Sequence, residues 1–190
     1  MKGPYILHKA IAIPVDMTNS QQPIFLTVLD KRHLEWIFVT GGCRKTEVDE
    51  PIKCAIRELH EETRGAVYIH KGKYSYFQFN TKTNSKKLGD VVNVYHVYVI
   101  DYSPTDKEKQ YIVDEFELVK EHMNKKKLDG VPVKRAWDEN ETMVFETLDQ
   151  MKQKTIWEII NKNVIENPDF ITALNSQNRQ SFNISTNHND

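Results

Sequence analysis

The sequence predicts a single α/β domain built as an α/β/α sandwich, with helices on both faces of a mixed β-sheet. Strand-like apolar segments precede and follow an amphipathic helix, an order typical of this class. No internal repeat or linker divides the chain, and 190 residues with 39% hydrophobic and 28% charged side chains suit one globular domain. We expect the domain to span residues 1–174 and the polar residues 175–190 to form a disordered tail.

The first three strands are predicted at residues 5–15, 24–30 and 35–40, which are rich in apolar and β-branched side chains. A turn-like segment separates the first two, so we expect a hairpin. Lys31 and Arg32 follow the second strand, where two cations either bind a substrate phosphate or are simply solvated. We include both among the candidate substrate-binding residues.

A helix is predicted from about residue 50 to residue 63. Asp49 is a suitable N-cap, Pro51 suits the first turn, and Gly65 suits the end of the helix. The apolar positions recur at i, i+3, i+4 and i+7, which predicts one buried face. They are Ile52, Ala55, Ile56 and Leu59.

The opposite face of this helix carries three carboxylates, Glu58, Glu61 and Glu62, at helical spacing. They could form a solvated acidic face, because like charges at i,i+4 cost only about 0.2–0.5 kcal/mol per pair. Gly41 and Gly42 immediately upstream favour a functional site, because glycines let the backbone approach a ligand closely. Oxygen-only ligands are typical of sites for Mg²⁺ or Mn²⁺.

The middle of the chain predicts two further strands, at residues 73–79 and 91–102, joined by a polar loop at 80–90. Residues 103–135 have the least regular pattern, with a short helix expected around residues 112–119. Lys125–Lys127 form a local basic patch that is either solvated or binds a polyanionic substrate.

The last part of the chain predicts a short strand at residues 143–145, preceded by an acidic loop. A helix entered near Thr147 or Asp149 should continue to about residue 163, and a final helix should span residues 168–174.

Composition excludes several classes of function. A net charge of −1 gives no overall basic field of the kind that drives nonspecific binding to nucleic acid or membranes. No stretch approaches 18 apolar residues and no leader is evident, so we expect no membrane partner. Two cysteines, Cys43 and Cys54, are too few for a disulfide framework and suit a reducing, cytoplasmic location. Exposed strand edges would allow a homodimer.

Residues 41–66 resemble the signature of the Nudix hydrolase superfamily, G-x(5)-E-x(7)-R-E-U-x-E-E-x-G-U, where U is aliphatic. The core R-E-U-x-E-E is matched residue by residue by Arg57, Glu58, Leu59, Glu61 and Glu62.

The chain departs from this signature on both sides of the core. Asp49 stands where the first glutamate is expected, and Glu47 is an alternative that lies two residues too far from Arg57. Cys43 stands where strict spacing would put the glycine, and Arg64 is an extra residue before Gly65. The departures concern the geometry of the loops more than metal binding.

The resemblance implies an α/β/α fold and metal-dependent hydrolysis of a phosphoanhydride in a nucleoside diphosphate linked to another group. By the same resemblance Mg²⁺ or Mn²⁺ would bind Glu58, Glu61 and Glu62. An ion pair of Arg57 with Asp49 would fix the start of the helix. The implied catalytic residues are Arg57, Glu58, Glu61, Glu62 and Glu141, with Glu139 as the alternative to Glu141 as further metal ligand or general base. Glu61 or Glu62 is a further alternative for the general base. Gly41, Gly42, Lys31 and Arg32 are the candidate substrate-binding residues.

The signature does not choose the substrate. The sequence of residues 54–63 is similar to that of Nudix enzymes from large DNA viruses, which include messenger-RNA decapping hydrolases. We therefore place capped RNA and cap-like or dinucleoside polyphosphates first. ADP-ribose, nucleotide sugars and diphosphoinositol polyphosphates are the alternatives. A non-catalytic nucleotide- or RNA-binding module on the same fold is the alternative of a different class.

Overall fold

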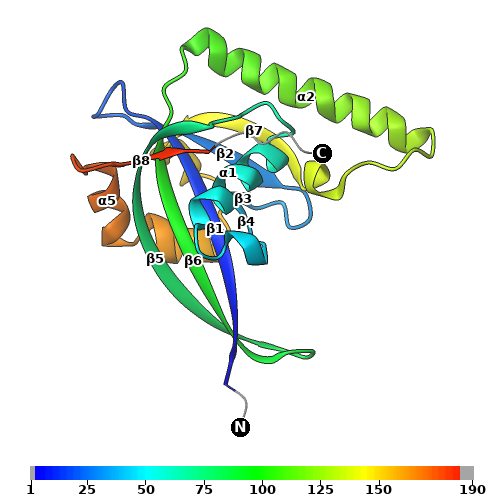
Figure 1. The fold of residues 1–190 in the computed structure, drawn as a ribbon. Helices are drawn as coiled ribbons and strands as arrows, with labels where there is room; N and C mark the ends of the chain where they lie inside the picture. The colour runs from blue at the N-terminus through cyan, green and yellow to red at the C-terminus, as the bar shows by residue number, and fades with distance from the viewer. Residues whose placement is uncertain (1–2, 185–190) are drawn as a thin grey trace.

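A mixed β-sheet organises the computed structural model, which describes residues 3–184 (Figure 1). In the sheet β3, β2, β1, β6, β5 and β8 lie side by side, while β4 adds to β1 and β7 adds to β2. β1 and β6 pair in parallel, and the other named strands pair antiparallel. The predicted α/β class with a mixed sheet is confirmed.

The strands are β1 (Tyr5–Asp16), β2 (Ile24–Asp30), β3 (Trp36–Ile37), β4 (Val39–Gly42), β5 (Lys71–Ser85), β6 (Gly89–Asp101), β7 (Asn140–Thr147) and β8 (Gln180–Asn183). The α-helices are α1 (Pro51–Glu62), α2 (Asp106–Leu128), α3 (Leu148–Met151), α4 (Glu158–Ile160) and α5 (Pro168–Leu174). Two 3-10 helices, η1 (Lys45–Glu47) and η2 (Arg135–Asp138), and a π-helical turn, η3 (Asn161–Ile165), complete the elements. None of these helices is both long enough and apolar enough to cross a membrane.

β1 is the centre of the sheet, and its apolar side chains from Ala10 to Ile13 are fully buried. One edge of β1 pairs with β6 along its whole length. The other edge pairs with β2 at Val15 and Asp16, which confirms the predicted hairpin, and with β4 from Lys9 to Ala12. The pairing with β4 places Gly41 beside Ala10 and delivers the chain into the loop before α1.

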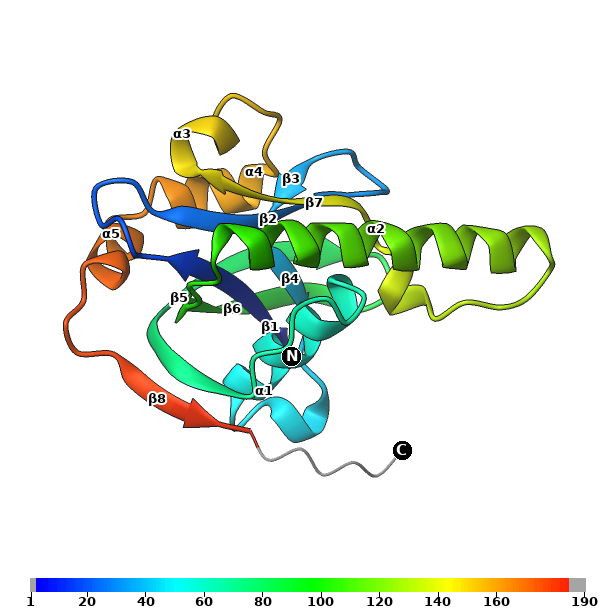
Figure 2. The ribbon, with the colours of Figure 1, turned by 90° about the horizontal axis from the view of Figure 1, so that it is seen from above.

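Helices cover the two faces of the sheet (Figure 2). α1 lies on one face and buries its predicted apolar stripe there. α4 and α5 lie on the other face, where Phe170 contacts Phe25 and Phe38 at ring-centroid distances of 6.0 and 6.2 Å. Tilted aromatic pairs of this kind contribute about 0.5–1.5 kcal/mol beyond their buried area, so they hold α5 against the sheet.

The prediction of a polar loop at residues 80–90 is wrong, because β5 and β6 continue through most of this segment as a hairpin. Thr81 pairs with Asn93 and Thr83 pairs with Val91, so β-branched polar residues extend both strands. Gly89, at φ +72°, closes the short turn. This ribbon projects from the body of the molecule (Figure 1), which explains its polar composition.

The irregular segment predicted at residues 103–135 is also largely wrong, because α2 occupies most of it. Thr105 caps the helix and Glu108 closes a capping box with it. Only Ile112, Phe116 and Met123 are buried along its length. A helix with so few buried positions has weak apolar periodicity, which is why its pattern appeared irregular.

The single helix predicted from residue 147 to residue 163 is interrupted. Thr147 caps α3 as predicted, but the chain then extends before α4 begins. Trp36 N donates to Thr155 O at 2.8 Å, and Trp157 N donates to Trp36 O at 3.1 Å. These bonds hold the segment beside β3 and replace the helical bonds it would otherwise make. The final helix, α5, has the predicted bounds.

The tail predicted to be disordered from residue 175 is wrong for β8, which pairs with residues 71–74 of β5. Phe182 supplies the reason: its side chain is buried against Gly72, a contact that the polar composition of the segment conceals. Residues 185–190 of the predicted tail lie outside the described residues.

Candidate catalytic site

The site begins with the contact between β4 and α1. A Cβ atom added to Gly41 would lie 1.9 Å from Cδ of Glu58, so the Glu58 carboxylate lies where any other side chain would be. Gly42 O accepts a hydrogen bond from Nη2 of Arg57 at 2.9 Å. The two glycines therefore position catalytic candidates, and both also line a neighbouring cleft.

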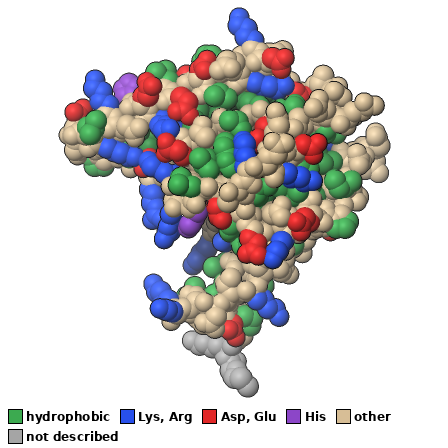
Figure 3. Space-filling model, turned by 180° about the vertical axis from the view of Figure 1, so that it is seen from behind, with side chains coloured by type: hydrophobic (Ala, Val, Ile, Leu, Met, Phe, Trp, Pro, Cys, Tyr) green, Lys and Arg blue, Asp and Glu red, His purple; other side chains and the backbone are tan. Residues whose placement is uncertain are grey.

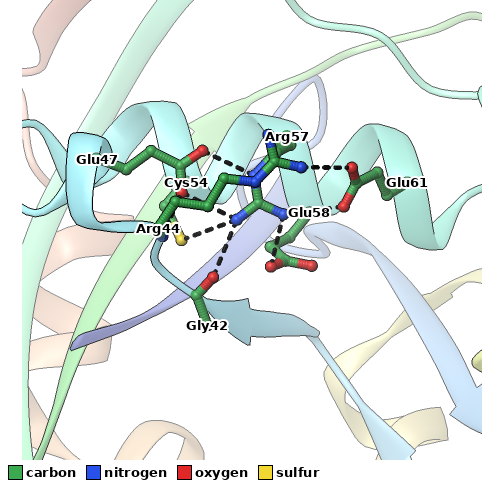
Figure 4. Close-up of polar contacts among 7 residues, drawn as sticks. All are labelled: Gly42, Arg44, Glu47, Cys54, Arg57, Glu58 and Glu61. Atoms are coloured by element: carbon green, nitrogen blue, oxygen red, sulfur yellow. Dashed lines mark hydrogen bonds and ion pairs between the residues drawn. The ribbon is translucent and has the colours of Figure 1, made fainter. Parts of the chain in front are cut away.

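Arg57 is the centre of an ion-pair cluster (Figure 4). Its Nε and Nη2 atoms donate to the two carboxylate oxygens of Glu47 at 2.7 and 2.9 Å. Its Nη1 atom donates to both Glu58, at 2.8 Å, and Glu61, at 2.9 Å. Burial lowers the pKa of Arg57, but the carboxylates outweigh it and the net pKa is raised.

Glu47, and not Asp49, is the carboxylate that fixes the start of this region, so the ion pair predicted between Asp49 and Arg57 is wrong. Glu47 is buried, and its Oε2 also accepts a hydrogen bond from the backbone N of Arg44 at 2.8 Å. Asp49 is not the N-cap either, since Glu50 takes that position without a side-chain hydrogen bond. Glu47 is the last residue of the 3-10 helix η1, and this turn accommodates the two additional residues between Glu47 and Arg57.

Glu58 and Glu62 are buried carboxylates, 9% and 3% exposed. Burial raises the pKa of Glu58, with Arg57 opposing the shift. Burial raises the pKa of Glu62 further, although Nδ2 of Asn140 donates to its Oε2 at 3.0 Å. At Glu58 burial outweighs the contact with Arg57, and at Glu62 it outweighs the hydrogen bond from Asn140.

Glu61 is more accessible than the other two glutamates and binds Arg44 Nη2 at 3.2 Å in addition to Arg57. The three predicted metal ligands therefore have different hydrogen-bond partners. Arg57 donates to Glu58 and Glu61, and Asn140 donates to Glu62. Among residues 3–184, no three His, Cys, Asp or Glu side chains converge closely enough to form a metal cluster.

The donor set nevertheless fits a hard divalent cation. All donors are carboxylate oxygens, which Mg²⁺ and Mn²⁺ prefer. The raised pKa values of Glu58 and Glu62 show that burial leaves their negative charge undercompensated, which a cation would correct. Gly41 leaves open the space that the Glu58 carboxylate needs.

Arg64 is a site residue that the sequence reasoning missed. It has φ 55°, so it, and not Gly65 alone, takes the left-handed conformation that ends α1. Its side chain is buried: Nε donates to Trp137 O at 2.8 Å, Nη2 donates to Asn140 O, and the guanidinium lies 3.9 Å from the ring centroid of Phe116. The sequence feature that could have identified Arg64 is that it is an extra residue, relative to the signature, before Gly65.

The loop held by Arg64 separates the two candidate general bases. Glu139 lines the cleft beside Gly41 and Gly42, and burial raises its pKa while Arg135 opposes the shift. Glu141 instead pairs with Lys120 of α2 at 2.8 Å, which lowers its pKa. The geometry places Glu139, the alternative, at the cleft, and it directs Glu141 away.

The cleft itself has a volume of about 350 Å³. Its walls include Lys9, Thr40, Gly41, Gly42, Glu139 and Trp157. Lys31 and Arg32, predicted to bind substrate, do not line it. They lie on the turn after β2 and line an adjoining pocket, and Lys31 pairs with Asp138 at 3.0 Å.

Comparison with known proteins adds independent findings. The NUDIX domain family model matches residues 7–165. The chain resembles the crystal structure of Shewanella oneidensis NrtR, with 14% identity, a TM-score of 0.51, and coverage of 87% of this chain and 64% of that one. It also resembles the NUDIX domain of the same protein complexed with ADP ribose, with 13% identity, a TM-score of 0.49, and coverage of 86% and 85%. A C. elegans Ap4A hydrolase binary complex gives 11% identity, a TM-score of 0.45, and coverage of 88% and 92%. No curated protein matches the chain. At these identities the structural likeness concerns the fold.

Proposed function

Because the chain belongs to the Nudix domain family, we propose that it is a metal-dependent pyrophosphohydrolase acting on a nucleoside diphosphate linked to another group. The observation that carries this proposal is the pair of buried carboxylates, Glu58 and Glu62, whose pKa values are raised by burial. A surface acidic face would not be buried in this way. Their environment supports a site that functions with a bound cation.

Glu58 and Glu62, with Glu61, would hold Mg²⁺ or Mn²⁺. Such a cation neutralises charge on a diphosphate, polarises phosphorus and lowers the pKa of a bound water. Arg57 positions two of these carboxylates through one nitrogen atom and ties them to the backbone of Gly42. Arg57 is therefore a positioning residue, since its contacts are with the carboxylates and the loop.

Glu139 takes the proton from the attacking water in this proposal, in place of Glu141. Its position on the cleft wall and its raised pKa suit a group that must accept a proton near neutral pH. Arg64 supports this role indirectly, because its bonds to Trp137 O and Asn140 O fix the residues on either side of Glu139.

The substrate classes are those that share a diphosphate. Capped RNA and cap-like or dinucleoside polyphosphates stand first, and ADP-ribose, nucleotide sugars and diphosphoinositol polyphosphates are the alternatives. The comparisons give no support to a viral decapping branch, so capped RNA is tested as one class among several.

The test is a hydrolysis screen of these substrates by mass spectrometry, with Mg²⁺ and with Mn²⁺. We expect Glu58→Gln and Glu62→Gln each to lower turnover by more than about a hundredfold, beyond what an outer-shell partner of a metal site costs. Glu139→Gln should lower it by about 10²–10⁴-fold, the range of a general base. Glu141→Gln is the matched control and should retain activity.

Circular dichroism and thermal unfolding would show that each variant is folded. Full activity in both Glu58→Gln and Glu62→Gln would contradict the assigned site. If no substrate is cleaved with either metal, the alternative of a non-catalytic binding module on this fold would be favoured.

A further inference from the structure

A second pocket, which we call the basic pocket, opens beside the catalytic cleft. It has a volume of about 370 Å³ and shares Asp30, His33 and Glu139 with the cleft. The rest of its wall is formed by Lys31, Arg32, Arg135 and Asp138. Because the two cavities share wall residues, a ligand bound beside Glu139 in the cleft can extend directly into the basic pocket.

The two segments that form this pocket are fixed to each other by their backbones. Lys31 N donates to Glu139 O at 2.9 Å, which joins the turn after β2 to the end of η2. The register of β2 against β7 shifts between Leu29 and Asp30 at this point. Asp30 Oδ1 then accepts a hydrogen bond from His33 N at 2.6 Å and holds the turn closed.

The charges around the basic pocket are paired unevenly. Asp138 binds two lysines, Lys31 and Lys127. Arg135 approaches Glu139 only at 3.9 Å, and its side chain is 91% exposed. Arg32 is exposed and makes no ion pair with any residue in the described range 3–184. The wall carries three cations, Lys31, Arg32 and Arg135, and three acids, Asp30, Asp138 and Glu139, and Lys127 of α2 adds a fourth cation against Asp138 from outside the wall.

Figure 3 shows one face of the molecule, on which Lys and Arg side chains are interspersed with Asp and Glu side chains. Two of the three acids, Asp30 and Glu139, also lie on the wall of the cleft, where the proposed function assigns Glu139 to the attacking water. The two arginines are thus the groups in this pocket whose charge is least engaged.

We infer that the basic pocket binds a phosphate group of the substrate beyond the scissile diphosphate, with Arg32 and Arg135 as its ligands. Arginine suits this role because its planar guanidinium donates two parallel hydrogen bonds to phosphate oxygens. The inference rests on the proposed function, and it narrows the substrate to one with an additional phosphate next to the anhydride that is cleaved. That phosphate belongs either to a longer polyphosphate chain or to an adjoining RNA phosphodiester.

Matched substrates test the inference. Diadenosine diphosphate carries no phosphate beyond the scissile pair, whereas diadenosine tetraphosphate does. We expect Arg32→Gln and Arg135→Gln each to raise KM for the tetraphosphate about tenfold, the effect of losing one charge-assisted hydrogen bond. KM for the diphosphate should change less than about twofold. Lys87→Gln, on the distant turn between β5 and β6, is the matched control. Equal effects on both substrates would overturn the inference, and so would the absence of any effect on both the tetraphosphate and a capped oligoribonucleotide.

A second pair of substrates separates the two sources of the phosphate. A cap dinucleotide and a capped oligoribonucleotide differ in their downstream phosphodiesters. If the arginine variants raise KM only for the oligoribonucleotide and leave the tetraphosphate unaffected, the bound phosphate belongs to RNA. The reverse result assigns it to the polyphosphate chain.

Binding measurements distinguish this inference from the proposed function. Isothermal titration calorimetry without added metal would compare inorganic tripolyphosphate with pyrophosphate. We expect tripolyphosphate to bind more tightly to the wild-type protein and this preference to disappear in Arg32→Gln/Arg135→Gln. Such binding in a protein that cleaves none of the substrates would contradict the proposed function but support the pocket. An unchanged preference in the double variant would contradict the pocket.

Discussion

Arg57 and Arg64 lie seven residues apart, one within α1 and the other just beyond its end, yet they are stabilised in opposite ways. Arg57 donates to three carboxylates, and its net pKa is raised. Arg64 donates to two backbone carbonyls and lies over Phe116, and burial lowers its pKa. Among the described residues, Nη1 of Arg64 has no hydrogen-bond partner.

The difference shows that one type of side chain performs two tasks around one helix. Arg57 gathers acidic residues whose mutual repulsion would otherwise oppose folding. Arg64 joins the end of α1 to the segment that carries Glu139 and Asn140, and its contacts outweigh the strain of its left-handed backbone. The first contribution depends on charge, and the second depends on geometry.

The largest expected effect that tests this comparison is that of Arg57→Ala. It would leave Glu47 buried without its cation, and breaking such a pair costs about 3–5 kcal/mol. Urea unfolding monitored by circular dichroism would measure the loss. Arg57→Lys should recover only part of it, because lysine cannot donate to Glu47 through two atoms. A loss below about 1 kcal/mol would show that the carboxylates do not depend on Arg57.

Arg64→Ala should have a smaller effect, about 2 kcal/mol, because it leaves two backbone carbonyls without their donor. Arg64→Gly loses the same hydrogen bonds but relieves the left-handed strain, so it should be about 1 kcal/mol more stable than Arg64→Ala. Hydrogen exchange should show faster exchange in residues 137–141 of both variants. Equal stability of the two variants would mean that the backbone at Arg64 is unstrained.

The smallest expected effect concerns pH. The pKa of Glu47 is lowered, because its bonds with Arg57 outweigh its burial. A lowered pKa stabilises the fold above the ordinary glutamate value, and this stability is lost as the pH falls below that value. The cost of Arg57→Ala should therefore shrink by about 1 kcal/mol between about pH 7 and pH 3.5. The cost of Arg64→Ala should change less, since the two carbonyls that Arg64 binds do not titrate. Parallel denaturation series at the two pH values would measure both.

The sequence predicted the fold best where apolar periodicity is strong. The bounds of β1, β2 and α5 follow from buried, alternating or helical patterns. α2 was predicted only as a short helix around residues 112–119, because it contacts the body through few side chains and its pattern carries little apolar signal. β8 was missed because its one buried side chain, Phe182, depends on a partner strand distant in sequence.

The part of the site that lies on α1 could be predicted from helical spacing. The spacing placed Glu58 and Glu62 on one face, and their burial agrees with a site and not with a solvated surface. Glu47 pairs with Arg57 because of the 3-10 turn η1, and no local sequence pattern predicted this turn. The choice between Glu139 and Glu141 depended on Lys120, which lies on α2 just beyond the part of this helix that was predicted.

The Glu58 carboxylate can occupy its observed position only because residue 41 is a glycine and has no side chain. An added methyl group at residue 41 would collide with the far end of a flexible side chain, so the carboxylate would move while the backbone stayed in place. Gly41→Ala thus offers a protein with every acidic group retained but one of them displaced. In Gly41→Ala the negative charge of Glu58 is kept and only its position changes, whereas a substitution of Glu58 removes the charge itself. Comparing the two variants therefore distinguishes the effect of the position of the carboxylate from the effect of its presence.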